Sequence, residues 1–210
     1  AAAAIYVITQ DDIHHSGTTD LPALLRQVPG LNVAQSGSPE WAVSSHGSND
    51  EFANKLLVLI DGRTVYTPLF SGVFWDTQDV PLQDIDRIEV IRGPGATLWG
   101  ANAVNGVINI ITKSAQDTQG GFASETAGNL DNSLTTVRYG AKIADNAYAR
   151  IYAKYDDYND VNKLNGTSNQ DPWNKAQTGF RSDWKIDDNQ SFTLQGDMYH
   201  AGEDTLIHLP

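Results

Sequence analysis

Two hydrophobic patterns follow one another along the chain. Up to about residue 115, short apolar runs alternate with glycine-rich turns and with one helical pattern. Beyond that point, apolar and polar residues alternate one by one through long segments. A period of two residues is typical of antiparallel strands with one polar face, whereas mixed periods are typical of an α+β domain. The change of pattern predicts a compact α+β domain over residues 1–115 and antiparallel strands over residues 116–210.

The first part contains one clear helix pattern and several strand patterns. Asp20 is placed to cap a helix, and Pro29 ends the pattern. The apolar residues of this helix recur at helical spacing and are Leu21, Leu24, Leu25 and Val28. Asp61-Gly62 predicts a hairpin over residues 56–66, because this dipeptide adopts the positive φ angles of a tight turn. The other predicted strands are residues 31–34, 42–45, 87–91 and 107–112.

The second part carries three segments of strict alternation, residues 147–156, 177–186 and 191–199. Short polar turns and one long polar loop, residues 156–174, separate them. Segments of about ten residues joined by alternating short turns and long loops are typical of an outer-membrane β-barrel. A soluble antiparallel sheet with one solvent-exposed face gives the same alternation of apolar and polar residues. About five strands are predicted, and the smallest such barrel has about eight. We therefore expect the first strands of an incomplete transmembrane β-barrel.

Composition excludes several classes of protein. The chain has no cysteine, which excludes disulfides and cysteine-based zinc sites. Its formal net charge of −12 argues against binding to a nucleic acid backbone. The sequence also lacks an apolar run of about eighteen residues, the length that predicts a transmembrane helix.

Neither an enzyme nor a metal protein is predicted. Gly93-x-Gly95 follows a strand, but Leu98 stands where a dinucleotide-binding motif needs its third glycine, so sharp backbone corners are the better interpretation. The five histidines are scattered without a familiar ligand spacing, and we interpret them as polar contacts; they are His14, His15, His46, His200 and His208. No arrangement of nucleophile and base is apparent.

Several motifs in order resemble the TonB-dependent outer-membrane receptors. They are LLRQVPGLNV, then LLVLIDGRTVY, then IDRIEVIRGPGATLWGANAVNGVINIITK, followed by the alternating strands. The resemblance covers residues 5–114 as a plug domain and the remainder as the first barrel strands. It implies a plug inside a barrel of about 22 strands in the bacterial outer membrane. It also implies uptake of a scarce ligand, most often a ferric siderophore, with haem or cobalamin as alternatives, energised from the inner-membrane complex through TonB.

The same resemblance assigns ligand-facing apices to three loops, residues 36–41, 48–54 and 67–75. The candidate ligand contacts in these loops are Trp41, Asn49, Phe70, Phe74 and Trp75, together with Tyr66 directly before the third loop. We expect the aromatic residues of the third loop to be exposed, since a large aromatic surface packs well on an apolar or planar ligand. The alternative is that Phe74 and Trp75 only pad the plug against the barrel wall.

The resemblance also implies a charged lock between plug and barrel, formed by Arg87, Glu89 and Arg92. The sequence departs from the family pattern in two places. His46 stands where the family commonly has arginine, which weakens the carry-over of the lock at that position. We also expect no TonB-binding segment before Ile5. A different class remains open, a β-rich binding module that recognises carbohydrate or protein without transport.

Overall fold

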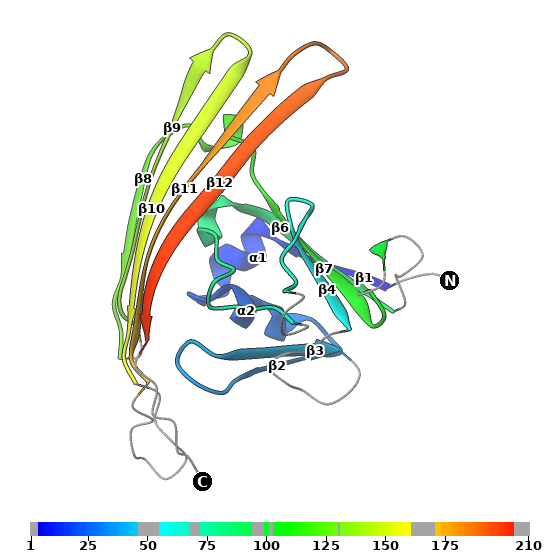
Figure 1. Ribbon diagram of the computed structural model, residues 1–210, viewed down its shortest axis with the longest axis vertical. Coiled ribbons are helices and arrows are strands. Elements are labelled where there is room, and N and C mark those ends of the chain that lie inside the picture. The colour runs from blue at the N-terminus through cyan, green and yellow to red at the C-terminus, as the bar shows by residue number, and fades with distance from the viewer. Residues whose placement is uncertain are drawn as a thin grey trace. The chain divides into compact units, whose positions relative to one another are not determined.

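The structure is a computed structural model that describes residues 4–45, 55–67, 72–93, 99–100, 103–129, 131–160 and 171–203. The chain divides into two compact units, Ala1–Thr112 and Lys113–Pro210. We call them the first unit and the second unit, and Figure 1 labels their elements.

The first unit combines strands with short helices. Its strands are β1 (Ala4–Thr9), β2 (Leu31–Gln35), β3 (Trp41–Ser45), β4 (Leu56–Ile60), β5 (Arg63–Thr64), β6 (Ile85–Arg92) and β7 (Gly106–Thr112). Its helical elements are α1 (Gln10–His15), α2 (Leu21–Leu24) and the 3-10 turns η1 (Leu25–Gln27) and η2 (Leu82–Asp84). One sheet has the order β1-β6-β7-β4-β5, with a parallel pairing of β4 and β7, while β2 and β3 form a separate antiparallel pair. The predicted α+β domain is confirmed.

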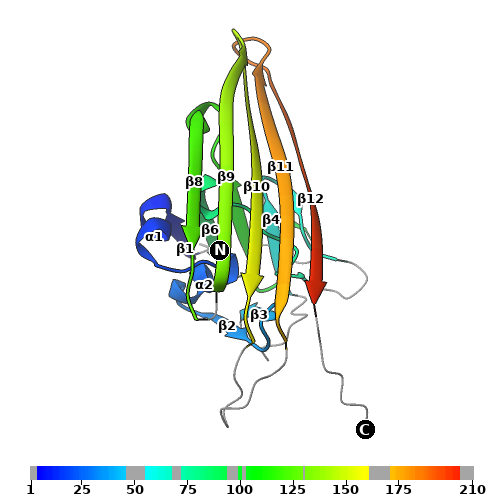
Figure 2. The ribbon, with the colours of Figure 1, turned by 90° about the vertical axis from the view of Figure 1, so that its left-hand side faces the viewer.

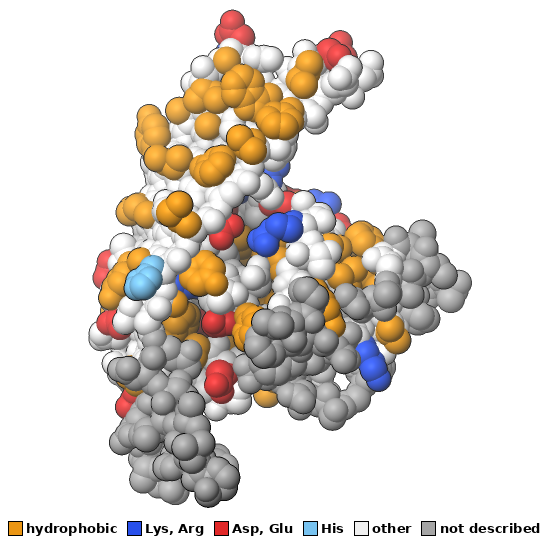
Figure 3. Space-filling view, in the orientation of Figure 1, with side chains coloured by type: hydrophobic (Ala, Val, Ile, Leu, Met, Phe, Trp, Pro, Cys, Tyr) orange, Lys and Arg blue, Asp and Glu red, His pale blue; other side chains and the backbone are white. Residues whose placement is uncertain are grey.

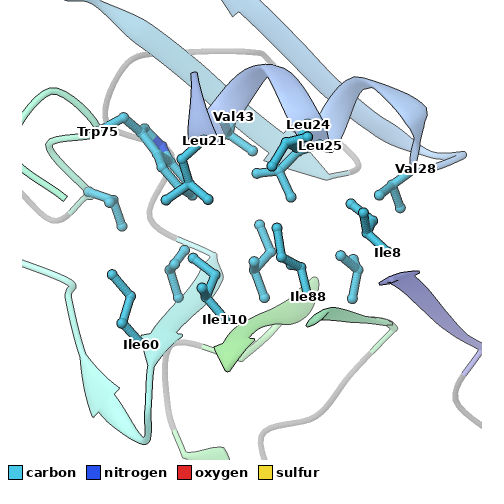
Figure 4. Close-up of a cluster of buried hydrophobic side chains, with 14 of the residues drawn as sticks. Ile8, Leu21, Leu24, Leu25, Val28, Val43, Ile60, Trp75, Ile88 and Ile110 are labelled. Atoms are coloured by element: carbon cyan, nitrogen blue, oxygen red, sulfur yellow. The ribbon is translucent and has the colours of Figure 1, made fainter. Parts of the chain in front are cut away.

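Isoleucines from four strands make a continuous row across the first unit's core. Ile8, Ile88, Ile110 and Ile60 are register partners along β1, β6, β7 and β4, and each is at most 5% exposed. Figure 4 shows the leucines of α2 and η1 pointing toward this row. β-branched residues suit a pleated surface, and burial of each such side chain stabilises the fold by about 1.5 to 3 kcal/mol.

The predicted helix after Asp20 is present but shorter and tighter than expected. All four residues of its apolar face are buried, as predicted. However, α2 passes into the 3-10 turn η1, and Val28 is already extended with φ −85° and ψ 116°. Val28 precedes Pro29, and a steric clash with the proline ring disfavours helical geometry for the residue before it. Asp20 has the extended backbone of an N-cap but makes no side-chain cap hydrogen bond; Pro22, the second helical residue, has no N–H to donate.

The second unit is built on one antiparallel sheet. Its elements are η3 (Gln116–Thr118), β8 (Gly120–Thr126), β9 (Asp131–Ala144), β10 (Ala147–Tyr158), β11 (Trp173–Lys185) and β12 (Ser191–Glu203). The strands pair in chain order from β8 to β12, as Figure 2 shows. The three alternating segments of the sequence are therefore confirmed as strands of a single sheet.

Register gives this sheet one polar face and one apolar face. Ile151 on β10 lies between Tyr139 on β9 and Phe180 on β11, and all three are exposed apolar side chains. Arg150, one residue earlier, lies between Gly140 and Arg181 on the opposite face. Successive side chains of a strand point to opposite faces, so this alternation continues along the sheet.

Candidate functional site

Two of the predicted ligand-binding aromatics belong to the core of the first unit. Trp41 and Trp75 are each 6% exposed and pack in the main hydrophobic cluster. Figure 4 shows the Trp75 ring beside Leu21 at one end of that cluster. The expectation that position 75 is an exposed loop aromatic is wrong, because the ring packs among the buried hydrophobic side chains of α2 and the sheet. Its role in ligand binding stays a prediction.

The Trp41 ring also packs against a cationic side chain. The Arg26 guanidinium lies 5.0 Å from the ring centroid, within the distance of a favourable cation–π contact. Arg26 belongs to η1 and Trp41 begins β3, so the contact ties the 3-10 turn to the two-stranded sheet. The geometry gives Trp41 a packing function in addition to the predicted ligand contact.

Tyr66 and Phe74 are the half-buried members of the predicted aromatic set. The Phe74 carbonyl accepts hydrogen bonds from the backbone amides of Thr77 and Gln78, at 3.2 and 3.1 Å. These bonds fix the turn that carries the Phe74 ring. Asn49, Phe70 and the histidine at position 46 lie outside the described residues.

The predicted charged residues of β6 contact one another within the first unit. The Arg87 Nε donates to Glu89 Oε1 at 2.8 Å, and Arg87 Nη1 donates to Asp86 at 2.6 Å. Asn109 on β7 donates to the second oxygen of Glu89 at 3.3 Å. The hydrogen bonds to Glu89 and then to Asp86 raise the pKa of the Arg87 guanidinium above its usual value. The predicted plug–barrel lock role of these residues stays a prediction.

Arg92, the third member of the predicted lock, holds the turn after η1. Its Nη1 donates to the Pro29 carbonyl at 2.9 Å, 63 residues away in the sequence. This carbonyl lies in the turn that follows η1, two residues beyond its last residue, Gln27. Arg92 therefore joins the end of β6 to the segment that leads into β2.

Asn105 makes structural contacts that were not predicted from the sequence. Its side-chain Nδ2 donates to the Ser45 carbonyl at 2.6 Å, and its backbone amide donates to the Lys55 carbonyl at 2.8 Å. Its own carbonyl accepts from Gly93 at 3.2 Å. Ser45 and Lys55 flank residues 46–54, which include the predicted ligand loop 48–54, so one asparagine contacts the described residues on both sides of that loop. The available signal was a polar residue in the run of small and apolar residues before β7.

The polar face of the second unit contains buried charges. Lys154 and Lys175 both approach Asp156 Oδ2, at 3.3 and 3.9 Å, and the three side chains are at most 9% exposed. Tyr158 and Trp173 stack nearby in register, with centroids 4.8 Å apart and rings 2° from parallel. Opposite charges at this separation in a partly desolvated site interact more strongly than at the surface. The face combines charged and aromatic groups at the end of the β10–β11 hairpin that leads to residues 159–172.

The apolar face of the second unit is exposed along all its long strands. Its large side chains are between 38% and 70% exposed and are Val137, Tyr139, Ile143, Ile151, Tyr155, Phe180, Trp184, Phe192, Leu194 and Met198. In Figure 3, hydrophobic side chains gather over the strands toward their two short turns, with acidic side chains at the tips. A contiguous apolar surface of this extent indicates an apolar surrounding or partner.

Other kinds of site find little support in the part of the chain that is described. No group of three or more histidine, cysteine, aspartate or glutamate side chains there is arranged to hold a metal ion. His14 and His15 contact each other edge to face on α1, with ring centroids 5.3 Å apart. Among the described residues, no helix has the length and apolar character needed to cross a membrane.

Comparison with known proteins places these features in a family. The model of the TonB-dependent receptor plug domain matches residues 1–107. The vitamin B12 transporter BtuB of Vibrio cholerae serotype O1 is 32% identical over 183 residues, which are 86% of this chain and 29% of the transporter. BtuB of Vibrio vulnificus is 35% identical over 128 residues, 60% of this chain and 20% of that protein. The chain thus spans less than a third of the length of these relatives.

Solved structures share the fold at lower sequence identity. A mutant of the ferric enterobactin receptor PfeA of Pseudomonas aeruginosa superposes with a TM-score of 0.70 at 21% identity, covering 97% of this chain and 34% of the receptor. The copper transporter OprC gives 0.75 at 18% identity, covering 95% and 30%. The siderophore receptor PirA of Acinetobacter baumannii gives 0.68 at 24% identity, covering 95% and 32%. The similarity extends over both units of this chain.

Proposed function

The chain belongs to the TonB-dependent receptor family, and on that basis we propose that it takes part in TonB-energised uptake of a scarce ligand across the bacterial outer membrane. TonB-dependent receptors are outer-membrane β-barrel proteins. The proposed partners are TonB with its inner-membrane energising complex, the lipid of the outer membrane and a small iron-chelate ligand.

One observation carries the proposal. A plug-domain match over residues 1–107 is followed in the same chain by strands of 12 to 14 residues from β9 to β12, with an exposed apolar face and a charged opposite face. Alternating strands with an apolar outer face are suited to lipid, and a polar inner face is suited to a solvated lumen. A soluble binding module has no need of that apolar face.

Two parts of the chain have different roles in this function. Residues 1–115 serve as the plug domain, and residues 116–210 serve as the first strands of the barrel. The division of the described chain between Thr112 and Lys113 is compatible with this assignment. Arg87, Glu89 and Arg92 serve as the plug side of the lock between the plug domain and the barrel.

The ligand class that we propose is a ferric siderophore, in line with the sequence resemblance. Cobalamin is the second candidate, and the observation that favours it is the 32% identity to a vitamin B12 transporter over 183 residues. Phe74 and Tyr66, the half-buried predicted contacts, are the first residues to examine for either ligand.

Uptake assays in cells with and without TonB test the proposal. Cells that express the full-length receptor are supplied with radiolabelled cobalamin or with ⁵⁵Fe bound to a panel of siderophores. We expect one ligand class to bind at the cell surface in both strains and to accumulate only where TonB is present. Equal accumulation in both strains contradicts energised uptake, and recovery of the receptor in a detergent-free soluble fraction supports the binding-module alternative.

A further inference from the structure

The second unit begins with the segment from Lys113 to Gln119, which we call the junction. The sheet of that unit holds the junction tightly. The junction contains the 3-10 turn η3, and its residues Ala115 and Thr118 are 0% and 2% exposed. The Thr118 hydroxyl donates to the carbonyls of Ser114 and Ala115, at 3.1 and 3.3 Å. The junction is therefore a compact turn with its own internal hydrogen bonds.

Arg150 on β10 binds the start of the junction. Its Nη1 donates to the Lys113 carbonyl at 2.6 Å and approaches the Thr118 hydroxyl at 3.4 Å. The Arg150 residue is 6% exposed. A charged donor on a backbone carbonyl makes a stronger hydrogen bond than a neutral one, and burial protects it from competing water.

Asp183 on β11 binds the next part of the junction. Its Oδ2 accepts the backbone amide of Ala115 at 2.6 Å. Arg181 and Thr193 orient the same carboxylate, with Arg181 Nε at 2.9 Å from Oδ2 and Thr193 Oγ1 at 2.7 Å from Oδ1. Two adjacent strands thus supply opposite charges, one for a carbonyl and one for an amide of the same short turn.

Gly140 on β9 provides space for the end of the junction. A Cβ atom at this position would lie 2.1 Å from the Thr118 carbonyl oxygen, closer than any real contact. The backbone of the junction consequently lies directly on the backbone of β9. Three neighbouring strands, β9, β10 and β11, each contribute one contact.

From this geometry we infer that Arg150 and Asp183 are positioning residues that anchor the junction to the sheet and confine energised rearrangement of the plug domain to residues before Lys113. The anchoring of the junction follows from these contacts alone, whereas the confinement of the rearrangement rests on the proposed function. Because both residues bind backbone atoms, side-chain changes within the junction leave these two contacts in place. Substitutions at positions 150 and 183 remove these two contacts directly.

Trypsin reports directly on the anchor. The protease cleaves after lysine and must hold the carbonyl oxygen of that lysine in its oxyanion hole, and Arg150 occupies this oxygen at Lys113. Purified full-length receptor in detergent is digested, and the fragment beginning at Ser114 is quantified by mass spectrometry. We expect this fragment to form at least about tenfold faster in Arg150→Met and in Asp183→Asn, the scale of one lost charge-assisted hydrogen bond. Arg150→Lys, which keeps a donor, should show an intermediate rate.

Matched controls separate the anchor from a general loosening of the sheet. Arg138→Met removes another arginine of the second unit, whose guanidinium lies 5.2 Å from the Phe122 ring. Gly140→Ala forces Thr118 away from β9, whereas Gly121→Ala adds a Cβ with nothing within 4 Å. Gly140→Ala should accelerate cleavage after Lys113 and Gly121→Ala should not. Cleavage in Arg150→Met, Asp183→Asn and Gly140→Ala no faster than in the two controls overturns the anchor.

Cell permeability tests the confinement of the rearrangement. Vancomycin is too large to cross an intact outer membrane, so killing by it reports a displaced plug. We expect the Arg150→Met/Asp183→Asn double variant to sensitise cells to vancomycin in the presence of TonB and not in its absence. If vancomycin sensitivity is the same with and without TonB, the plug rearrangement is not confined by Arg150 and Asp183. If trypsin cleavage after Lys113 is still accelerated in that case, the anchoring of the junction is nevertheless supported. Failure of ligand uptake in the parent receptor would instead count against the proposed function.

Discussion

The Asp61 carboxylate accepts two hydrogen bonds from Thr112, one from its backbone amide and one from its hydroxyl, both at 2.8 Å. Asp61 opens the turn after β4 with φ 47°, and Thr112 ends β7. The last residue of the first unit is thereby fixed by a side chain of that unit, just as Lys113 and Ala115 are fixed by side chains of the second. The backbone on either side of the division is held by charged groups.

Changes at Asp61 are expected to free the end of β7. Asp61→Asn keeps one acceptor oxygen and tolerates the positive φ angle, so the Thr112 amide should exchange with deuterium on the order of tenfold faster. Asp61→Ala loses both acceptors and is strained at this φ, so exchange should accelerate by about a hundredfold. Hydrogen exchange measured by mass spectrometry on the full-length receptor gives both rates. The control is Asp11→Asn, because the Asp11 side chain is 87% exposed on α1. Exchange at Thr112 that is unaffected by Asp61→Ala would contradict a stabilising role of the two hydrogen bonds between Asp61 and Thr112.

Phe74 and Trp75 are adjacent in sequence but are expected to respond differently to truncation. Trp75→Ala removes a core ring and should destabilise the first unit by about 3 to 5 kcal/mol, seen as proteolysis of the plug domain in the folded receptor. Phe74→Ala removes a half-buried ring and should leave proteolysis near the parent rate while weakening ligand affinity about tenfold. Ligand binding to whole cells measures the affinity. If the ligand affinity of Phe74→Ala is unchanged, Phe74 does not contact the ligand and serves only in packing.

The elements of this fold were largely predictable because their signals are local. The Asp61-Gly62 hairpin, the apolar helix face and the alternating strands of the second unit are each encoded within a few residues and are present as expected. The position of Trp75 was not predictable, because only the tertiary packing decides whether a loop aromatic turns outward or closes the core. The predicted extent of the helix was wrong at its end, where Pro29 acts through the residue before it.

The polar contacts of the candidate site were beyond sequence reasoning for a related reason. Asn105, Arg150 and Asp183 bind backbone atoms 37 to 68 residues away. A backbone amide or carbonyl carries no signature in the sequence, so the partner of such a side chain is unknown until the chain is folded. The assignment of Arg87, Glu89 and Arg92 rests on family resemblance, and their observed contacts lie within the first unit.

Asn105 is expected to stabilise both ends of residues 46–54. Asn105→Asp replaces the donating amide with a carboxylate, which cannot donate to the Ser45 carbonyl and repels it. The loss should cost about 1 to 3 kcal/mol locally and accelerate hydrogen exchange in β3 by roughly ten- to a hundredfold. Asn109→Asp on β7 serves as the matched control, since Asn109 contacts Glu89 instead. If the hydrogen exchange rates of β3 are equal in Asn105→Asp and Asn109→Asp, the contacts of Asn105 do not stabilise β3.

The capping box of α1 is expected to make the start of the first unit sensitive to acid. The Thr9 backbone amide and hydroxyl donate to Asp12 Oδ2 at 2.9 and 2.6 Å, and the Asp12 amide donates back to Thr9 at 3.2 Å. The side-chain hydrogen bond from Thr9, followed by the backbone one, holds the pKa of Asp12 below its ordinary value of 3.8. A carboxyl whose pKa is lower in the folded state stabilises the fold above its unfolded pKa. That contribution disappears as the pH falls through the lowered value.

Protection of the α1 amides against hydrogen exchange should therefore be constant from neutral pH to about pH 5 and should fall between about pH 4 and pH 2. Protection factors, corrected for the intrinsic pH dependence of exchange, measure this directly. In Thr9→Val the hydroxyl is lost, so protection should be lower at neutral pH and its acid step should shrink. In Asp12→Asn the titrating group is absent and the step should vanish, whereas Asp11→Asn should retain it. An acid step of the same size in Asp12→Asn would assign the sensitivity to another carboxyl.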